Sequence, residues 1–591
     1  EALPELVSAM QDWPEFAPGW HLLGTLNLQL RRYREAEGFC RRARQLDPGN
    51  DVFAQDYVRC LFLLRRYEEA IALAEPLLKR SPANHVVRFL LGSSLARLGR
   101  VPAAAEQFSQ VPLSAELASG EWQEMGSFLL RKGMDYQQSG AALERAVELD
   151  SSNFGARNEL AWHYVATFEF EKAAEGFLQA AADADKPWSF YSNYLFVSTY
   201  YLNLPPEELL RRHQGWNAKC TPPRPGGITR RRGRAKPLKI GYVSGDFRQH
   251  VVWNFIEPII RGHDRRRVSV HCFHQWKGSD SHTEQLRELA DGWVDTHGMD
   301  ADGLASHIRQ AEIDVLVDLS GHTKGNRLDA FAQRCAPLQL SYLGYIATTG
   351  VAEMDVRLSD SVLTPSDTSE LFSEQLFRLP RCYKAYQADQ PECKIASRAG
   401  ARELVFGSLH RLQKITEATI DLWAGILAAV PESKLLIARR ELGHPANYKA
   451  LLARFQAHGI AEHQLILKGN WQGSHLNVYN EIDIALDTFP VTGGATTAEA
   501  LWMGVPVVTL AGGMMRERIS ASILHGLGRP EWVATSKRAA IEIAAALACE
   551  VRRPGFSKEG LRQHFMQSEL GDGASLAAAL EDAYVSLLAQ A

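Results

Sequence analysis

The sequence predicts a chain of α plus α/β class, in which a superhelix of helical repeats is followed by two Rossmann-like lobes. Three observations predict this fold class: a residue pattern that returns every 34 or 35 residues, the loss of that pattern after residue 187, and an alternation of short apolar runs with helical patterns from residue 238 onward. Repeats of this length are supersecondary units that stack on one another. Strands that alternate with helices form parallel sheets covered on both faces.

The first predicted domain is a set of helical repeats over residues 1–187. An aromatic or apolar residue recurs at Tyr33, Tyr67, Val101, Tyr136 and Phe170, and a small residue follows three positions later at Ala36, Ala70, Ala104, Ser139 and Ala173. This pattern resembles the tetratricopeptide repeat, in which two helices approach closely at small residues. Such superhelices present extended concave binding surfaces. The repeats therefore predict a polypeptide acceptor along their groove.

Residues 188–237 are predicted to join the repeats to the lobes. Residues 188–216 have the pattern of one or two further helices, and residues 220–237 are rich in Pro, Gly and Arg. The arginines of the second segment, Arg230, Arg231, Arg232 and Arg234, fit either a phosphate or nucleic-acid patch or a solvated linker. The formal net charge of −4 argues against a nucleic-acid binder, so a linker is the preferred interpretation.

Two series of candidate strands follow. The N-terminal lobe, residues 238–400, has candidate strands at 238–244, 268–274, 314–320 and 338–345, with helical patterns at 281–290 and 301–312. The C-terminal lobe, residues 401–591, has candidate strands at 403–410, 434–440, 464–469, 483–488 and 506–510, and ends in closing helices. Irregular sequence near 360–400 separates the two series. Because open parallel sheets bind ligands beyond the carboxyl ends of their strands, the paired lobes predict a cleft for a nucleotide-bearing substrate.

Polar residues follow the candidate strands of the N-terminal lobe. Asp246 and His250 follow the strand at 238–244, one helical turn apart. The segment 321–327 (GHTKGNR) follows the third candidate strand, and 343–350 (LGYIATTG) follows the start of the fourth. These loops are expected to line the cleft from one side.

The C-terminal lobe carries a predicted anion site. His410, Arg411 and Lys414 lie between a candidate strand and a helix, and the segment 493–497 (GGATT) starts another helix. Backbone N–H groups at a helix start point toward one position, where the helix dipole favours an anion. A diphosphate fits this position, with Lys414 as the fixed cation beside it.

No motif predicts a metal site, a disulfide framework or a membrane span. The acid-x-acid motif occurs at 183–185, within the repeats, and at 300–302, where Asp is favoured as a helix N-cap. The eight cysteines are scattered without a CxxC pair, which is typical of reduced thiols in a cytoplasmic protein. The chain has no run of about 18 apolar residues, and its first residues do not have the pattern of a signal peptide.

Taken together, these motifs resemble glycosyltransferase family 41, the O-linked N-acetylglucosamine transferases, and in particular a bacterial relative of them. The marks are KIGYVSGDF, LVDLSGHTKGNR, LGYIATTG, RLQKI and LDTFPVTGGATT with the EALWMGVPVVT that follows. The resemblance spans the repeats, the joining helices and both lobes. It implies a GT-B fold and an inverting, metal-independent transfer of N-acetylglucosamine from UDP-GlcNAc to Ser or Thr hydroxyls of proteins, with no cofactor besides this donor.

The resemblance also implies roles for individual residues. Lys414 matches the lysine that touches the donor diphosphate, and His250 matches a histidine beside the sugar and phosphates. The other matches are Asp246 one turn before that histidine, Leu343 and Gly344 at the sugar pocket, His475 against the uracil, Glu499 at the ribose hydroxyls, and Gly494, Ala495 and Thr496 as the phosphate-binding turn. His410 and Arg411 are expected beside the same nucleotide.

Four residues depart from the family pattern. Val251 stands where Pro is common, Ala495 where a hydroxyl residue is usual, Glu499 where Asp is common, and Arg411 replaces a Gln of some members. The leading hypothesis is a UDP-sugar:protein O-glycosyltransferase. The alternatives are O-fucosyl transfer from GDP-fucose, glucosyl transfer from UDP-glucose, and a repeat scaffold that binds nucleotide sugar without turnover. The general base is His250, Asp246 or a phosphate of the donor.

Overall fold

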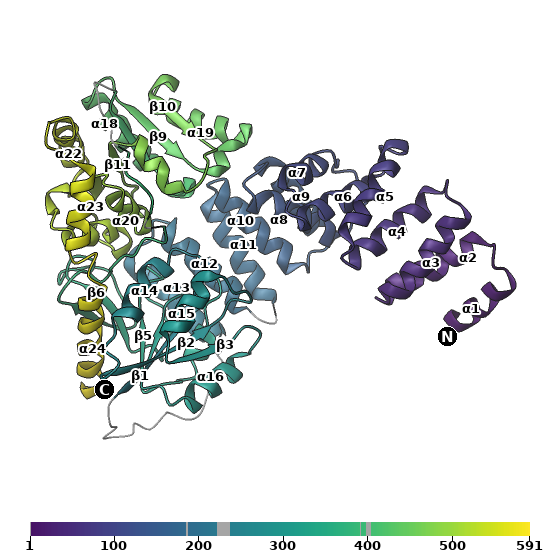
Figure 1. The fold of residues 1–591 in the computed structure, drawn as a ribbon, viewed down its shortest axis with the longest axis horizontal. Coiled ribbons are helices and arrows are strands. Elements are labelled where there is room, and N and C mark those ends of the chain that lie inside the picture. Colours follow the sequence, from purple (N-terminus) through teal and green to yellow (C-terminus); the bar gives the residue numbers. More distant parts are fainter. Residues whose placement is uncertain (1, 185–186, 221–236, 391, 397–402, 591) are drawn as a thin grey trace. The chain divides into compact units, whose positions relative to one another are not determined.

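The structure is a computed structural model that describes residues 2–184, 187–220, 237–390, 392–396 and 403–590 (Figure 1). The arginines of the predicted linker, Arg230, Arg231, Arg232 and Arg234, lie outside the described residues. The chain divides into two compact units, Glu1–Thr167 and Phe168–Ala591.

The first unit consists of paired helices. Its helices are α1 (Ala2–Asp12), α2 (Ala17–Gln29), α3 (Tyr33–Leu46), α4 (Asp51–Leu63), α5 (Tyr67–Arg80), α6 (His85–Arg97), α7 (Val101–Ser109), α8 (Ser119–Arg131), α9 (Tyr136–Leu149) and α10 (Phe154–Ala166). The recurring aromatic or apolar residue begins the second helix of each pair, as at Tyr33 and Tyr67. The small residues Ala36 and Ala70 are fully buried. These positions confirm the predicted repeats.

Close helix packing explains why the repeats require small residues. A methyl group on Gly24 would lie 2.4 Å from Cys40 Sγ, and one on Gly92 would lie 2.6 Å from the Phe108 ring. Both glycines lie on the first helix of a pair and face the second helix. A larger residue at either position would force the two helices apart.

The second unit begins with α11 (Phe170–Asp183), α12 (Trp188–Tyr200) and α13 (Pro206–Cys220). The Phe170 ring stacks on Tyr201 at 4.7 Å between centroids. Helix α12 is tied to the first lobe by Ser192, whose hydroxyl donates to His322 Nδ1 at 3.0 Å, and by Thr199, which contacts the Tyr345 hydroxyl at 2.7 Å. The boundary between the units therefore falls within the last repeat, whereas the sequence pattern placed it after residue 187.

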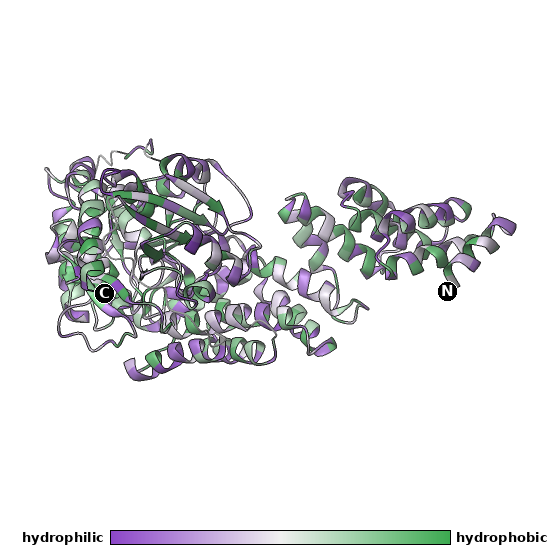
Figure 2. Cartoon of the chain, turned by 90° about the horizontal axis from the view of Figure 1, so that it is seen from below, coloured by the Kyte–Doolittle hydropathy of each residue, from purple (hydrophilic) through white to green (hydrophobic). Residues whose placement is uncertain are grey.

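The first lobe contains a parallel sheet with the strand order β3-β2-β1-β4-β5-β6-β7. The strands are β1 (Leu238–Ser244), β2 (Val268–His274), β3 (Gly292–Asp295), β4 (Val315–Asp318), β5 (Leu338–Ser341), β6 (Val356–Asp360) and β7 (Gln375–Leu379). The helices are α14 (Trp253–Gly262), α15 (Ser281–Leu289), α16 (Ala301–Gln310) and α17 (Leu328–Phe331). Its central strands are buried, and the cartoon coloured by hydropathy shows apolar strands inside more polar helices (Figure 2).

The second lobe contains a parallel sheet with the order β10-β9-β8-β11-β12-β13. Its strands are β8 (Val405–Ser408), β9 (Lys434–Ala438), β10 (Leu465–Lys468), β11 (Ile484–Leu486), β12 (Val507–Leu510) and β13 (Val533–Ala534). The helices are α18 (Glu417–Ala429), α19 (Pro445–Ala457), α20 (Ala495–Trp502), α21 (Ile519–Gly526), α22 (Lys537–Glu550), α23 (Lys558–Gln567) and α24 (Gly573–Gln590).

The last helix returns to the first lobe. Helix α24, yellow in Figure 1, lies among the teal elements of that lobe. Its Tyr584 hydroxyl lies 3.2 Å from the Tyr242 hydroxyl on β1, and its Glu581 carboxylate lies 2.9 Å from His263 Nδ1. One hydrophobic core extends from Ile240 to Leu587 through both lobes. The lobes therefore share a common interior.

Each sheet has a topological switch point, which is where open parallel sheets bind ligands. In the first lobe it lies between β1 and β4, and in the second between β8 and β11. The loops that follow β1 and β4 contain residues 245–252 and 319–327. The loops that follow β8 and β11 contain residues 409–416 and 487–494. The fold thus brings the predicted polar loops to the binding edges of the two sheets.

Candidate functional site

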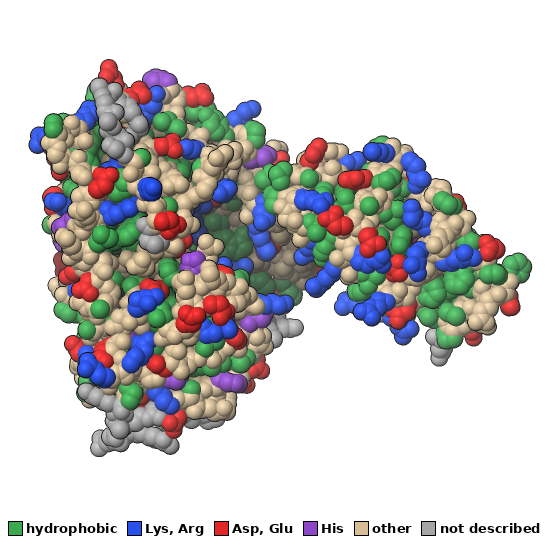
Figure 3. All heavy atoms as spheres, viewed as in Figure 1, with side chains coloured by type: hydrophobic (Ala, Val, Ile, Leu, Met, Phe, Trp, Pro, Cys, Tyr) green, Lys and Arg blue, Asp and Glu red, His purple; other side chains and the backbone are tan. Residues whose placement is uncertain are grey.

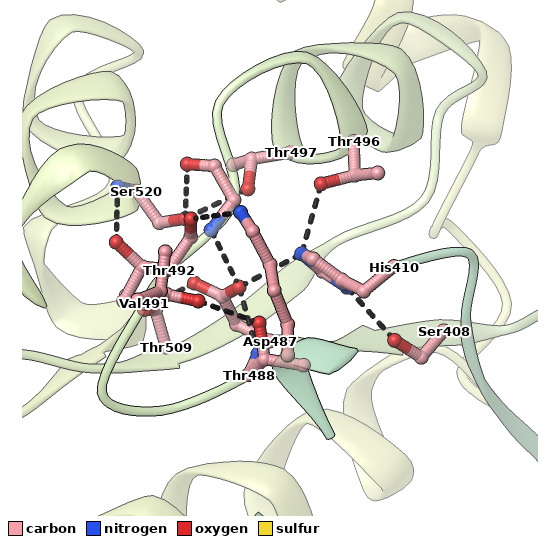
Figure 4. Close-up of polar contacts among 12 residues, drawn as sticks. Ser408, His410, Asp487, Thr488, Val491, Thr492, Thr496, Thr497, Thr509 and Ser520 are labelled. Atoms are coloured by element: carbon pink, nitrogen blue, oxygen red, sulfur yellow. Dashed lines mark hydrogen bonds and ion pairs between the residues drawn. The ribbon is translucent and has the colours of Figure 1, made fainter. Parts of the chain in front are cut away.

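The loop after β11 is folded around the buried carboxylate of Asp487 (Figure 4). Oδ1 accepts hydrogen bonds from the backbone N–H groups of Thr488 and Gly493, each at 2.8 Å, and Oδ2 accepts one from the Thr509 hydroxyl at 2.6 Å. Burial raises the pKa of Asp487, but the hydrogen bonds from His410 and neighbouring hydroxyls outweigh burial and lower it overall. The charged form therefore fixes the loop.

The same loop leads into the uncapped start of helix α20. Gly494 occupies the N-cap position, and the first helical hydrogen bond runs from Ala498 N to Gly494 O. Within this helix, the N–H groups of Ala495, Thr496 and Thr497 therefore have no acceptor. Gly494, Ala495 and Thr496 are partly exposed. A helix start of this kind favours an anion, as the sequence predicted.

Gly493 is needed because three side chains crowd it. A methyl group at this position would lie 2.3 Å from Thr497 Oγ1, 2.8 Å from Thr496 Oγ1 and 2.9 Å from His410 Nε2. Real Cβ atoms do not approach so closely, so any other residue would shift the turn.

His410 lies behind this turn and orients Thr496. Its Nδ1 lies 2.8 Å from the Ser408 hydroxyl, and its Nε2 lies 3.1 Å from Asp487 Oδ1 and 2.8 Å from Thr496 Oγ1. Burial lowers the pKa of His410, so the ring is neutral and carries one proton. That proton must be on Nε2, because the Asp487 carboxylate only accepts. Thr496 Oγ1 then accepts as well, which leaves its own O–H free to donate to a ligand.

Lys414 reaches the turn from the loop after β8. It ends the 3-10 helix Leu412–Lys414, and its Nζ donates to the Thr492 carbonyl at 3.0 Å. Burial, with the nearby charge of Arg411, lowers the pKa of Lys414 to about 8, although Asp487 opposes the shift. Lys414 is thus beside the anion-binding turn, where the sequence placed it.

The loop after β1 places Asp246 and His250 together. Asp246 is buried, and its Oδ1 lies 3.5 Å from His250 Nδ1. The predicted helical turn between them is wrong: the segment consists of bends and turns, and α14 begins only at Trp253. Burial lowers the pKa of His250, and so do Arg248 and Arg411, while Asp246 opposes the shift. Because Arg411 lowers the pKa of both His250 and Lys414, it lies near both lobes' loops.

Leu343 and Gly344 lie in the loop after β5. Leu343 has a φ of +60°, an uncommon conformation for a side chain of this size. Gly344 packs against the segment after β4, since a methyl group there would lie 1.9 Å from the Leu319 carbonyl oxygen. In the adjacent loop, His322 is buried and donates from Nε2 to the Thr349 carbonyl at 2.7 Å, whereas Lys324 is exposed. His322 therefore supports the loop from the interior.

His475 and Glu499 form a pair at the far side of helix α20. His475 Nε2 lies 3.1 Å from Glu499 Oε1, and the Tyr479 hydroxyl donates to Glu499 Oε2 at 3.4 Å. The hydrogen bond with Glu499 raises the pKa of His475 despite partial burial. Glu499 belongs to helix α20, so this pair adjoins the helix whose start is described above.

Two residues that the sequence pattern did not single out take part in this arrangement. Asp487 organises the turn, and Lys384, on the segment after β7, is buried with its Nζ 3.4 Å from the position of a methyl group on Gly494. Lys384 stands in an otherwise apolar run, Cys-Tyr-Lys-Ala-Tyr. A charged residue inside an apolar run is the sequence signal that could have marked Lys384 as a functional residue.

The described residues contain no group of three or more His, Cys, Asp and Glu side chains placed to hold a metal ion. Among them, no helix is both long and apolar enough to cross a membrane. On the face shown in Figure 3, Lys and Arg side chains are interspersed with Asp and Glu over each unit.

The structure has two Rossmann-like lobes, and a glycine turn leads into a helix start at the switch point of the second lobe. This is the architecture of a GT-B glycosyltransferase. The chain belongs to glycosyl transferase family 41, whose family model matches residues 228–390 and 394–578. Tetratricopeptide repeat models match residues 27–80 and 61–118.

Known relatives agree with this assignment. Two plant proteins named probable UDP-N-acetylglucosamine–peptide N-acetylglucosaminyltransferase SPINDLY are similar to the chain: that of Arabidopsis thaliana is 33% identical over 64% of this chain and 42% of its own length, and that of Petunia hybrida is 31% identical over 75% and 44%. The chain thus spans less than half the length of these relatives. A Lys-to-Met variant of Thermobaculum terrenum O-GlcNAc transferase superposes with a TM-score of 0.73 at 32% identity, over 86% of this chain and 98% of that one.

Proposed function

We propose that the protein transfers N-acetylglucosamine from UDP-GlcNAc to Ser or Thr hydroxyls of polypeptides. The observation that carries the proposal is the turn Gly493–Thr496, where an uncapped helix start, the Thr496 hydroxyl and Lys414 converge. Such a site fits the diphosphate of a nucleotide sugar. The names of the relatives support N-acetylglucosamine as the sugar.

The donor would lie along helix α20. Its diphosphate would bind at the helix start, and its ribose and base would extend toward Glu499 and His475. The sugar would then point toward the first lobe, where Leu343, Gly344 and His250 lie after strands β5 and β1. No divalent cation is needed in this arrangement, because Lys414 and the backbone N–H groups meet the charge of the phosphates.

The transfer would be a direct displacement that inverts the anomeric carbon. The acceptor oxygen forms the new bond as the bond between sugar and diphosphate breaks, and the leaving UDP keeps the electron pair. Lys414 and the helix start stabilise the charge that grows on this leaving group. The acceptor proton would pass to the His250 ring, because a lowered pKa keeps the ring neutral and able to accept it. A phosphate of the donor is the alternative base.

The helical repeats would deliver the polypeptide acceptor. Superhelices of such repeats have extended concave surfaces, and each repeat contributes a similar increment of that surface. The cytoplasmic location expected from the cysteine pattern belongs to the same proposal.

A panel of donors tests the proposed reaction. The full chain is incubated with a protein acceptor and with UDP-GlcNAc, UDP-glucose or GDP-fucose, and the acceptor mass is measured. N-acetylhexosamine addition from UDP-GlcNAc, abolished in Lys414→Met, is the expected result. Preferential transfer of glucose or fucose would correct the sugar. Binding of the donors without transfer or hydrolysis would favour the scaffold hypothesis.

A further inference from the structure

Lys384 is a buried cation that has no anionic partner among the residues that the structure describes. It is 7% exposed, and its ammonium lies over the rings of Phe255 and Tyr383, each at 4.8 Å from the centroid. Among the described residues, no hydrogen bond or ion pair of this ammonium is found. Cation–π contacts contribute on the order of 0.5–2 kcal/mol each, less than the cost of burying an unpaired charge.

The carboxylate of Asp360, which acts on Lys384, already has other partners. Asp360 raises the pKa of Lys384 by less than burial lowers it. Its Oδ1 accepts from the N–H groups of Val362 and Leu363, and its Oδ2 accepts from Tyr383 N and the Ser522 hydroxyl. Both oxygens of Asp360 are thus satisfied without Lys384. The charge of Lys384 remains uncompensated within the described chain.

The position of Lys384 indicates what would compensate it. Its Nζ lies 3.4 Å from where a methyl group on Gly494 would stand, at the partly exposed start of α20. Burial, together with the nearby charges of Arg357 and Lys414, lowers the pKa of Lys384 to about 8. Two lysines that repel each other therefore flank one helix start.

The two lysines come from different lobes. Lys414 belongs to the loop after β8, whereas Lys384 follows β7 and packs against Phe255 on the first turn of α14. Helix α14 directly follows the loop that carries His250. An anion between the lysines would thus be held by both lobes at once.

We propose that Lys384 is a second cation of the donor site, which binds the diphosphate from the first lobe opposite Lys414 and the start of α20. This inference rests on the proposed function, since it assigns a further contact to the same donor. The buried charge is held in place by aromatic rings before the donor arrives, so its side chain is already ordered for binding.

The test compares ligands with and without phosphates. Binding of UDP, inorganic pyrophosphate and uridine is measured by titration calorimetry with the full chain, Lys384→Met and Lys384→Arg. We expect Lys384→Met to bind UDP and pyrophosphate at least tenfold more weakly and uridine within twofold of the unchanged chain. Lys384→Arg should recover most of the loss. Lys277→Met, at an exposed lysine of the first lobe, is the matched control and should bind all three ligands normally.

Equal affinity of Lys384→Met and the unchanged chain for UDP and pyrophosphate would overturn the proposal. An equal loss for uridine would do so as well, because it would indicate a distorted site. If Lys384→Met does not fold, Lys384→Gln takes its place in the same comparison. Pyrophosphate binding does not depend on the donor sugar or on transfer, so a failure of the proposed reaction remains distinguishable from a failure of this contact.

Discussion

Replacing Lys384 with Met should stabilise the protein in the absence of ligand. The substitution keeps the length and apolar stem of the side chain and removes a charge that is buried between Phe255 and Tyr383. Methionine also packs well against aromatic rings. Most substitutions of buried residues destabilise a protein, so a gain here would be diagnostic.

The size of the expected gain in the free energy of unfolding follows from the pKa of Lys384. A decrease from 10.5 to about 8 corresponds to roughly 3 kcal/mol by which the fold disfavours the charged form. Met also loses the attraction of the charge to the two rings, which offsets part of this gain. We therefore expect a gain of about 1–3 kcal/mol at pH 7, seen as a rise in Tm of a few degrees.

The stability difference between Lys384→Met and the unchanged protein should depend on pH. Between about pH 8 and 10.5, the unfolded chain holds a proton on Lys384 that the folded chain has lost, so the stability of the unchanged protein rises with pH in this window. The advantage of Lys384→Met should therefore be full below pH 8 and vanish near pH 10.5. Scanning calorimetry of both proteins at several pH values measures it. An equal or lower Tm for the variant at pH 7 would mean that the buried charge of Lys384 does not lower the stability of the fold.

Four further predictions concern the donor site and the repeats. Lys414→Ala should lower kcat by about 10²-fold or more and weaken UDP binding less, because its contact strengthens as the diphosphate leaves; near-normal turnover in steady-state kinetics would place the diphosphate elsewhere. His410→Phe should weaken UDP binding about tenfold in calorimetry, since the Thr496 hydroxyl loses its fixed orientation, and unchanged affinity would contradict the relay from Asp487. UDP affinity should survive excess EDTA, whereas a tenfold loss, about 1.4 kcal/mol, would reveal a metal. A chain that begins at Phe168 should bind UDP but lose activity on protein acceptors, and undiminished glycosylation by it would rule out delivery by the repeats.

The fold was predictable where one physical signal dominates. The repeats are recognisable from the residues that begin their second helices. The predicted strands at 238–244 and 268–274 coincide with β1 and β2. Most strands that the sequence missed lie at sheet edges: β3 and β7 are at the two ends of the first sheet and partly exposed, and β13 is an edge of the second. The sequence also missed β6, which is buried inside the first sheet but reads Val-Arg-Leu-Ser-Asp and so has polar residues within the run. Edge strands lack the continuous apolar run that marks a buried strand.

The donor site was predictable only where its parts are local in sequence. The glycine turn and Lys414 each lie next to a predicted strand, so strand topology alone brought them together. The role of Asp487 depends on contacts with Thr509, 22 positions later, and with His410, 77 positions earlier. The role of Lys384 depends on its approach to Gly494, 110 positions later and in the other lobe. Such long-range contacts leave no local pattern. The predicted helical turn before His250 failed because bends can bring residues four positions apart equally close.

The central claim is that the start of α20 holds the diphosphate of a sugar donor while a polypeptide hydroxyl displaces it. The most direct measurement is the intact mass of a Ser- and Thr-containing protein acceptor after incubation with the full chain and UDP-GlcNAc, beside the same reaction with Lys414→Met. We expect added N-acetylhexosamine in the first reaction and at least a hundredfold less in the second, consistent with a transition-state contact. Equal modification by both proteins, or no modification by the full chain, would contradict the proposed reaction.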